Sequence, residues 1–156
     1  DCSDLTSITL PESVTEIGRG AFSGCSGLTS ITLPDSVTEI GAGVFAGCSN
    51  LESIKVNENN KVYDSRENCN AIIKKSSNTL IAGCKNTKIP SGVTKIGDDA
   101  FFCCSGLTSI TIPESVKEIG YRAFSVCDNL TNITWKGNIY ASVNDFMNAF
   151  QTQMIS

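Results

Sequence analysis

The stretch LTSITLPESVTEIGRGAFSGCSG at residues 5–27 is followed directly by LTSITLPDSVTEIGAGVFAGCSN at residues 28–50. The two segments are almost the same and have the same length. Self-similarity at a fixed period is the signature of a repeat architecture, in which each unit buries its apolar face against the next unit. The fold of the whole chain is therefore expected to follow from this unit.

Similar units fill most of the chain. Their consensus is L-x-x-I-x-L-P-x-x-V-x-x-I-G-x-x-A-F-x-x-C-x-x, and the fourth unit departs from it until Pro90. The units start near Leu5, Leu28, Leu51, Cys84, Leu107 and Leu130. We expect one repeat domain over residues 1–156. Because CSD before Leu5 matches the end of a unit, we also expect the chain to be part of a longer protein.

Each unit predicts two short extended segments. LTSITL alternates apolar and hydroxyl residues, as in a parallel strand with Ile8 and Leu10 inward and Thr9 outward. VTEI predicts a second short strand on another side of the coil. A proline ends the first strand because it cannot donate to the ladder. The recurrent glycine predicts a turn with positive φ, at Gly18, Gly41, Gly97 and Gly120.

The repeat resembles the BspA-like leucine-rich repeats, the 23-residue bacterial subclass of that family. The match extends to about Lys136, and seven or more positions recur at fixed offsets in four units. The resemblance implies an α/β repeat fold, a right-handed solenoid of short parallel strands. It also implies a cell-surface or secreted protein of host-associated bacteria, among which some members are adhesins.

The unit from Leu51 to Gly83 is ten residues longer than its neighbours. NAII and TLIA, separated by KKSSN, predict a β-hairpin within an insert at about 57–83. One interpretation is a tolerated variant of the repeat, and the other is a binding loop. In the second interpretation the contact residues are Tyr63, Arg66, Lys74 and Lys75.

The segment 138–156 leaves the repeat. Ser142 followed by Asp145 resembles a helix N-terminus. An apolar stripe at helical spacing comprises Val143, Phe146, Met147 and Phe150. We expect a helix that covers the last coil, because the end of a solenoid must be shielded from water. An amphipathic helix that binds a partner is the alternative.

The cysteines follow the repeat. The same offset is shared by Cys2, Cys25, Cys48, Cys104 and Cys127, which favours free, buried thiols, although bridges between neighbouring coils stay possible at this spacing. A cross-strand disulfide between Cys69 and Cys84 stays open if the hairpin turns near residues 76–77. No C-x-x-C pair supports a zinc or thioredoxin-like site.

Composition argues against several classes of protein. The chain has no histidine, a net charge of −4 and no Lys/Arg cluster, so we expect no enzyme, no metal, no cofactor and no nucleic-acid partner. No apolar run is long enough to span a membrane. Acidic residues align at two offsets, Glu12, Asp35 and Glu114 and then Glu16, Glu39 and Glu118; a bound cation and a solvated face are the two interpretations.

The outward row of the first strands is the candidate binding surface. It comprises Thr9, Thr32, Lys55, Lys88, Thr111 and Thr134. Aromatic residues outside the repeat core add Tyr63, Tyr121, Trp135 and Tyr140 as candidates. These features favour a monomeric, non-catalytic module that binds a protein or glycan, host extracellular matrix included. The alternative function is a structural spacer that carries another domain away from the cell surface.

Overall fold

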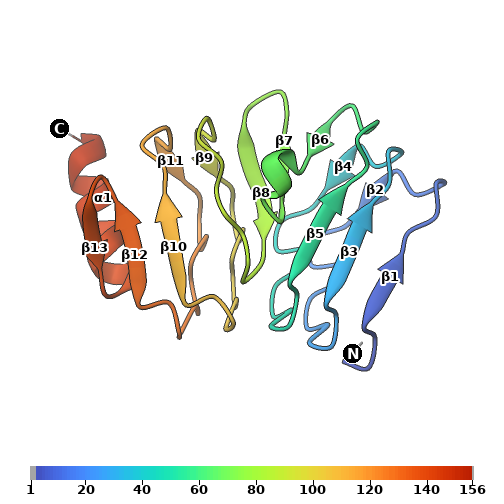
Figure 1. The fold of residues 1–156 in the computed structure, drawn as a ribbon, viewed down its shortest axis with the longest axis horizontal. Coiled ribbons are helices and arrows are strands. Elements are labelled where there is room, and N and C mark those ends of the chain that lie inside the picture. The colour runs from blue at the N-terminus through green and yellow to red at the C-terminus, as the bar shows by residue number, and fades with distance from the viewer. Residues whose placement is uncertain (1–2, 156) are drawn as a thin grey trace.

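The computed structural model describes residues 3–155, so Cys2 of the cysteine row lies outside the description. Over the described residues the chain forms a β-solenoid with a single α-helix at its C-terminal end (Figure 1). Its strands run along two faces, named here the front face and the back face. The predicted solenoid of short parallel strands is confirmed.

The front face carries the first strands of the regular units. One parallel sheet has the order β1-β3-β5 and a second sheet has the order β10-β12-β13. Ile8 lies opposite Ile31, and Ile110 lies opposite Ile133, so the register equals one repeat. The bounds are β1 Ser7–Thr9, β3 Ser30–Leu33, β5 Ser53–Val56, β10 Ser109–Ile112, β12 Asn132–Trp135 and β13 Asn138–Tyr140.

The back face carries the second strands. β2 (Glu16–Ile17) pairs with β4 (Glu39–Ile40). A five-stranded sheet follows in the order β11-β9-β8-β7-β6. Its members are β6 Tyr63–Asp64, β7 Ala71–Lys74, β8 Thr79–Gly83, β9 Lys95–Ile96 and β11 Glu118–Ile119. The predicted hairpin is β7–β8, and β8 pairs in parallel with β9, so the insert is part of the stack.

Phenylalanine rings stack from coil to coil inside the solenoid. The rings of Phe22 and Phe45 have centroids 6.1 Å apart, and those of Phe101 and Phe124 are 5.2 Å apart and nearly parallel. Leucines at the start of the units are fully or almost fully buried, as at Leu28, Leu51, Leu107 and Leu130. Equivalent side chains thus bury each other, as the repeat predicts.

The recurrent glycines have a different role from the predicted one. None of the four, Gly18, Gly41, Gly97 and Gly120, lies in the left-handed region. A Cβ on Gly41 would lie 2.3 Å from the backbone nitrogen of Arg19 in the preceding coil. At Gly120 it would lie 2.6 Å from the backbone nitrogen of Asp98. Glycine is needed there because neighbouring coils approach too closely for a side chain.

The C-terminal segment covers the last coil as predicted. A two-residue turn at Lys136–Gly137, with φ of 50° and 80°, folds β13 back onto β12, as in a type I′ hairpin. Helix α1 (Val143–Ile155) then begins after Ser142, whose hydroxyl accepts a hydrogen bond from the Asp145 N–H at 3.1 Å. Phe146 and Phe150 of this helix are buried against Trp135.

The cysteine row forms side-chain hydrogen bonds between coils. The Cys48 thiol donates to the Phe22 carbonyl at 3.0 Å, and the Cys127 thiol donates to the Phe101 carbonyl at 3.0 Å. Cys48, Cys104 and Cys127 are free and buried, as expected. Cys25 takes part in a disulfide, so the expectation of a free thiol is wrong at that position.

Cys69 and Cys84 are free and buried, so the disulfide left open in the insert does not form. Ile73 lies opposite Leu80, but a register shift between Ile72 and Ile73 puts Ala71 opposite Gly83. Cys69 and Cys84 therefore do not continue the pairing of the hairpin.

Of the described residues, no helix is long and apolar enough to cross a membrane.

Candidate binding face

The front face is interrupted between β5 and β10. No strand forms over residues 86–89, where the fourth unit would supply one. Thr87 occupies the place that isoleucine holds in the regular units. Its hydroxyl accepts from the Cys84 N–H at 2.8 Å and donates to the Asn70 carbonyl at 2.6 Å, while its own N–H donates to the Cys84 carbonyl. Thr87 is thereby held in a turn instead of a ladder.

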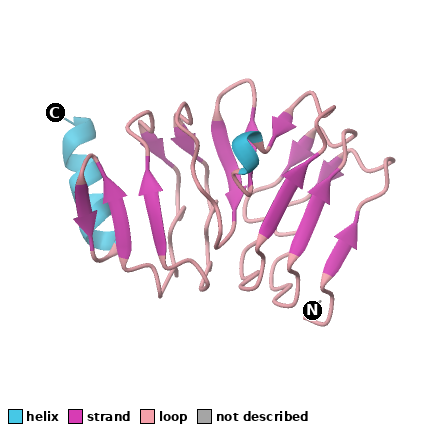
Figure 2. Ribbon diagram, viewed as in Figure 1, coloured by secondary structure: helices cyan, strands magenta, loops and turns pink. Residues whose placement is uncertain are grey.

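The insert caps the edge of β5 at this interruption. The side chain of Asn70 accepts from the Ile54 N–H at 3.4 Å, and that of Ser65 accepts from the Val56 N–H at 3.0 Å. Figure 2 shows the short 3-10 turn η1 (Arg66–Asn68) at this place, between β5 and β8. Side chains therefore replace the strand that would have continued the sheet.

A groove of about 520 Å³ lies beside the interruption, on the front face of β10 and β12. One wall is the segment 85–89, and the floor is formed by outward residues of the two strands. The lining residues used below are Lys85, Lys88, Ser109, Thr111, Asn132 and Thr134. The volume falls within the range of about 300–1,000 Å³ that is common for ligand sites.

The predicted outward row is divided by the same interruption. Thr9, Thr32 and Lys55 lie side by side on β1, β3 and β5 and are exposed. Thr111 and Thr134 lie side by side on β10 and β12, in the groove. Lys88 is exposed and lies on the groove wall, outside any strand.

The candidates from the insert are not part of this surface. Tyr63 is only 4% exposed, and its hydroxyl donates to the Thr38 carbonyl at 3.4 Å, so its prediction as a contact residue is wrong. Arg66 is paired with Asp64 through two nitrogens, at 2.8 and 2.9 Å, and also donates to Asn78. Both residues hold the insert together.

The two lysines of the hairpin are exposed. Lys74 ends β7, and Lys75 follows it with its ammonium 2.5 Å from the Asn60 carbonyl. They belong to the sheet of the back face and do not join the groove. They remain candidates for a separate contact only.

Trp135 is fully buried and is wrong as an exposed aromatic candidate. Its ring packs against Phe146 and Phe150 at centroid distances of 5.8 and 5.2 Å. Tyr140 is half-buried against Phe146, whereas Tyr121 is 70% exposed, beside the Arg122 guanidinium. No aromatic side chain lines the groove.

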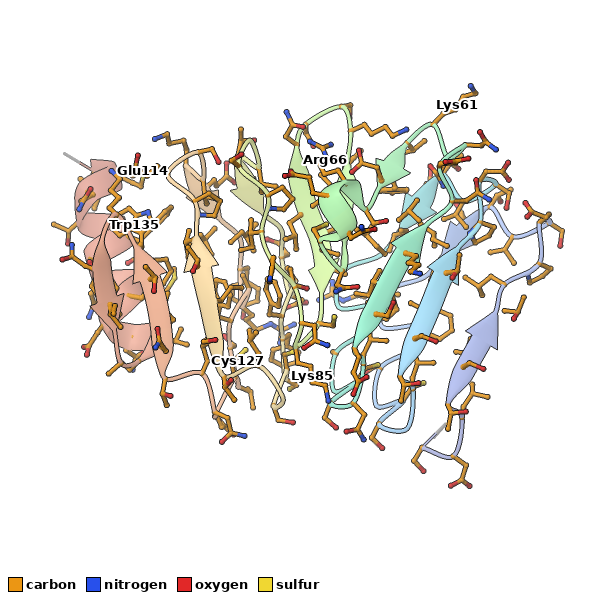
Figure 3. All side chains as sticks on the ribbon, in the orientation of Figure 1. Lys61, Arg66, Lys85, Glu114, Cys127 and Trp135 are labelled. Carbon is orange, nitrogen blue, oxygen red and sulfur yellow. The ribbon has the colours of Figure 1, made fainter. Side chains whose placement is uncertain are left out.

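Lys85 lines the groove but was not among the binding residues predicted from the sequence. Its side chain lies across Gly106 and its ammonium is 3.6 Å from the Glu52 carboxylate. Figure 3 shows it at the end of the gap between the two front sheets, far from Trp135. Its offset is that of Thr6 and Thr29, outside the outward row, so only the departure of the fourth unit from the consensus pointed to it.

The acidic columns are exposed pairs. Hydrogen bonding between the side chains of Glu16 and Glu39, which lie opposite each other, raises the pKa of Glu16. Asp35 raises the pKa of Glu12 in the same way. In the third pair Lys95 replaces one carboxylate and lies 2.8 Å from Glu118. No group of three metal-ligating side chains occurs among residues 3–155. The paired carboxylates of Glu12, Glu16, Asp35 and Glu39 are exposed, as on a solvated face.

The free thiols are not poised for chemistry. Burial raises the pKa of Cys48, Cys69 and Cys127 to about 11 and that of Cys104 to about 12. A thiol must lose its proton to act as a nucleophile or metal ligand. These residues therefore serve packing and hydrogen bonding.

Solved structures with the same fold come from bacteria. A leucine rich cell surface protein from Faecalibacterium prausnitzii is 36% identical, with a TM-score of 0.68, over 83% of this chain and 35% of that one. A leucine-rich repeat protein from Eubacterium ventriosum is 26% identical, with a TM-score of 0.62, over 83% and 42%. The pneumococcal vaccine antigen PcpA, 24% identical with a TM-score of 0.63 over 86% and 40%, shares the fold.

The chain spans well under half the length of these structures. None of the curated proteins matches it. The family model described as BspA type leucine rich repeat region matches residues 1–78 and 73–156, with six copies. The chain therefore belongs to the BspA type leucine rich repeat family.

Proposed function

We propose that this chain is a non-catalytic binding module of a bacterial cell-surface or secreted protein, and that it holds a macromolecular partner against its front face as an adhesin does. The observation that carries the proposal is the interruption of the front sheet, which leaves a groove of about 520 Å³ between the segment 85–89 and the outward residues of β10 and β12. Leucine-rich repeat domains are protein-interaction modules, which agrees with this role.

The chemistry of the groove supports binding without turnover. Its lining has lysine, hydroxyl and amide side chains and contains no carboxylate, thiol or imidazole. The serine and threonine hydroxyls of the lining therefore have no imidazole or carboxylate beside them in the groove to act as a general base. The groove can supply hydrogen bonds and positive charge, which fit recognition.

The test removes the groove while it keeps the stack. Residues 51–83 are replaced by a copy of the regular unit 28–50, and Thr87→Ile restores the consensus of the fourth unit. A regular strand is then expected over residues 86–89, so that the front sheet becomes continuous. Parent and graft are compared for binding to extracellular-matrix proteins and to a glycan array.

We expect the parent to bind a component of these panels and the folded graft to lose at least tenfold in affinity. Circular dichroism and thermal melting establish that the graft is folded. If the graft binds as well as the parent, the groove is not the site, and the row at Thr9 and Thr32, which the graft keeps, takes its place. If the parent binds nothing, the spacer function is favoured.

A further inference from the structure

One edge of β10 is open toward the groove. In a strand, the backbone N–H and C=O of successive residues point to opposite sides. The Thr108 carbonyl accepts from the Thr131 N–H, so Thr108, Ile110 and Ile112 face β12. Ser109 and Thr111 therefore face the segment 85–89, and no hydrogen bond joins their backbone groups to any described residue.

One of the backbone groups that would have met this edge is used elsewhere: Thr87 N–H donates to the Cys84 carbonyl at 3.1 Å. Lys88 N–H points to the other side, by the same alternation, and donates to the Cys69 carbonyl of the insert at 3.0 Å. The opposite edge at β5 is capped by Asn70 and Ser65. The edge of β10 is thus the uncapped one of the two, and it opens into a groove.

The groove is positive although the chain carries a net charge of −4. Lys88 is exposed and forms no ion pair with a described residue, while Lys85 is paired only loosely with Glu52. With no carboxylate in the lining, a negatively charged group on a ligand would meet uncompensated lysine.

We propose that the groove binds an extended acidic peptide segment of a partner protein. Its backbone pairs with Ser109 and Thr111 as an added strand, and its carboxylates meet Lys88 and Lys85. This inference rests on the proposed function and names the kind of partner. An open strand edge complements another peptide backbone, whereas the aromatic side chains on which sugars commonly stack do not line this groove.

The first test uses the peptide acetyl-Val-Glu-Val-Glu-Val-amide and its Val-Lys-Val-Lys-Val counterpart as probes. Titration of ¹⁵N-labelled full-length chain gives affinity and site together. We expect the acidic peptide to bind at least tenfold more tightly and to shift the amide signals of Ser109 and Thr111. Equal affinity of the two peptides, or shifts confined to other residues, would overturn the proposal.

The second test changes the peptide backbone and leaves the protein intact. One derivative of the acidic probe is N-methylated at the internal valine, and the other at both glutamates. These N–H groups point to opposite sides of an extended peptide, so only one derivative should lose affinity, by about fivefold for each lost hydrogen bond. If both derivatives bind like the parent peptide, no strand is added and the proposal fails.

The charge is tested with Lys88→Gln, with Lys61→Gln as its matched control. Both lysines are exposed, but Lys61 does not line the groove and lies at the far edge of the molecule in Figure 3. We expect a loss of about fivefold in affinity for the acidic peptide from Lys88→Gln alone. Equal effects of the two variants would contradict the assignment.

The outcomes separate this inference from the proposed function. If the acidic peptide does not bind, but the parent binds a matrix protein or glycan and the graft does not, the inference fails and the proposed function stands. A carboxylated or sulfated oligosaccharide that binds at Lys88 without shifting Ser109 or Thr111, with no peptide binding, would likewise assign the groove to glycans and overturn the peptide proposal.

Discussion

The solenoid contains two kinds of junction between units. The regular junction is that of the second unit with the first, and the irregular junction is that of the fourth unit with the insert. At the regular junction, each bond is a copy: the Asn50 amide donates to the Ser26 carbonyl, as Asn129 donates to Ser105 in a later pair of units. At the irregular junction, residues without a counterpart satisfy the backbone, among them Asn70 and Thr87. Asn60 does the same on the other side of the insert, where the insert meets the second unit.

The comparison shows where this fold can carry function. A regular junction uses its backbone groups on the neighbouring coil and leaves none for a ligand. The irregular junction breaks the front sheet and leaves the edge of β10 without a partner. The insert matters less as a contact loop than as the cause of this interruption.

The largest effect is expected from Phe101→Ala, because this ring contributes to both kinds of junction. It stacks on Phe124 and covers Gly83 so closely that a Cβ there would lie 2.3 Å from the ring. Loss of burial together with a cavity should cost about 3–5 kcal/mol of unfolding free energy. Urea denaturation measures it, and a loss below about 1 kcal/mol would contradict the stacked core.

A smaller effect, about 2–4 kcal/mol, is expected from Asn60→Ala. Asn60 is 1% exposed; its amide nitrogen donates to the Pro34 and Val37 carbonyls, and its oxygen accepts from the N–H groups of Val62 and Tyr63. The matched control Asn50→Ala removes one exposed bond and should cost under about 1 kcal/mol. Equal losses in urea melts would show that the insert needs no dedicated side chain to join the second unit.

A comparison of Gly41→Ala with Gly18→Ala tests whether the recurrent glycine is needed for the close approach of neighbouring coils. Both positions share one offset, but a Cβ on Gly18 would meet nothing within 4 Å, whereas a Cβ on Gly41 would collide with the backbone of Arg19. We expect a loss of about 1–3 kcal/mol for Gly41→Ala and almost none for Gly18→Ala. A turn requirement would instead make both variants equally unstable in thermal melts.

The smallest effect on stability at neutral pH is expected from ionisation of the buried thiols, and this effect grows at alkaline pH. Burial raises the pKa of Cys48 and Cys127 from 9.0 to about 11. The unfolded chain therefore loses these protons first, so stability is complete below pH 9 and falls as the pH rises toward 11. Urea midpoints of the parent should fall more steeply over this window than those of a Cys48→Ala/Cys127→Ala variant. If the urea midpoints of parent and variant fell in parallel with pH, the raised pKa values of the two thiols would be contradicted.

Most of the fold could be predicted from the repeat, because the apolar positions that recur in each unit are those that pack against the neighbouring coil. The strand register, the inward phenylalanines, the hairpin and the helix after Ser142 all follow from local pattern and periodicity. The outward positions of Thr9, Thr32, Lys55 and Thr111 follow from the same alternation. The turn at Lys136–Gly137 had a local signal too, although the repeat gave none for β13.

The tertiary structure decided what depends on neighbouring coils. Tyr63 looks like an exposed aromatic because it lies outside the consensus, yet it fills the insert. Trp135 differs from the consensus leucine but holds its inward position opposite Ile112, and it lies under the cap helix. Gly41 matches a turn signal, but its neighbour Arg19 is 22 residues away in sequence. The open edge of β10 exists because Thr87 bonds to Asn70. This hydrogen bond joins two different coils, so the periodicity of the sequence does not indicate it.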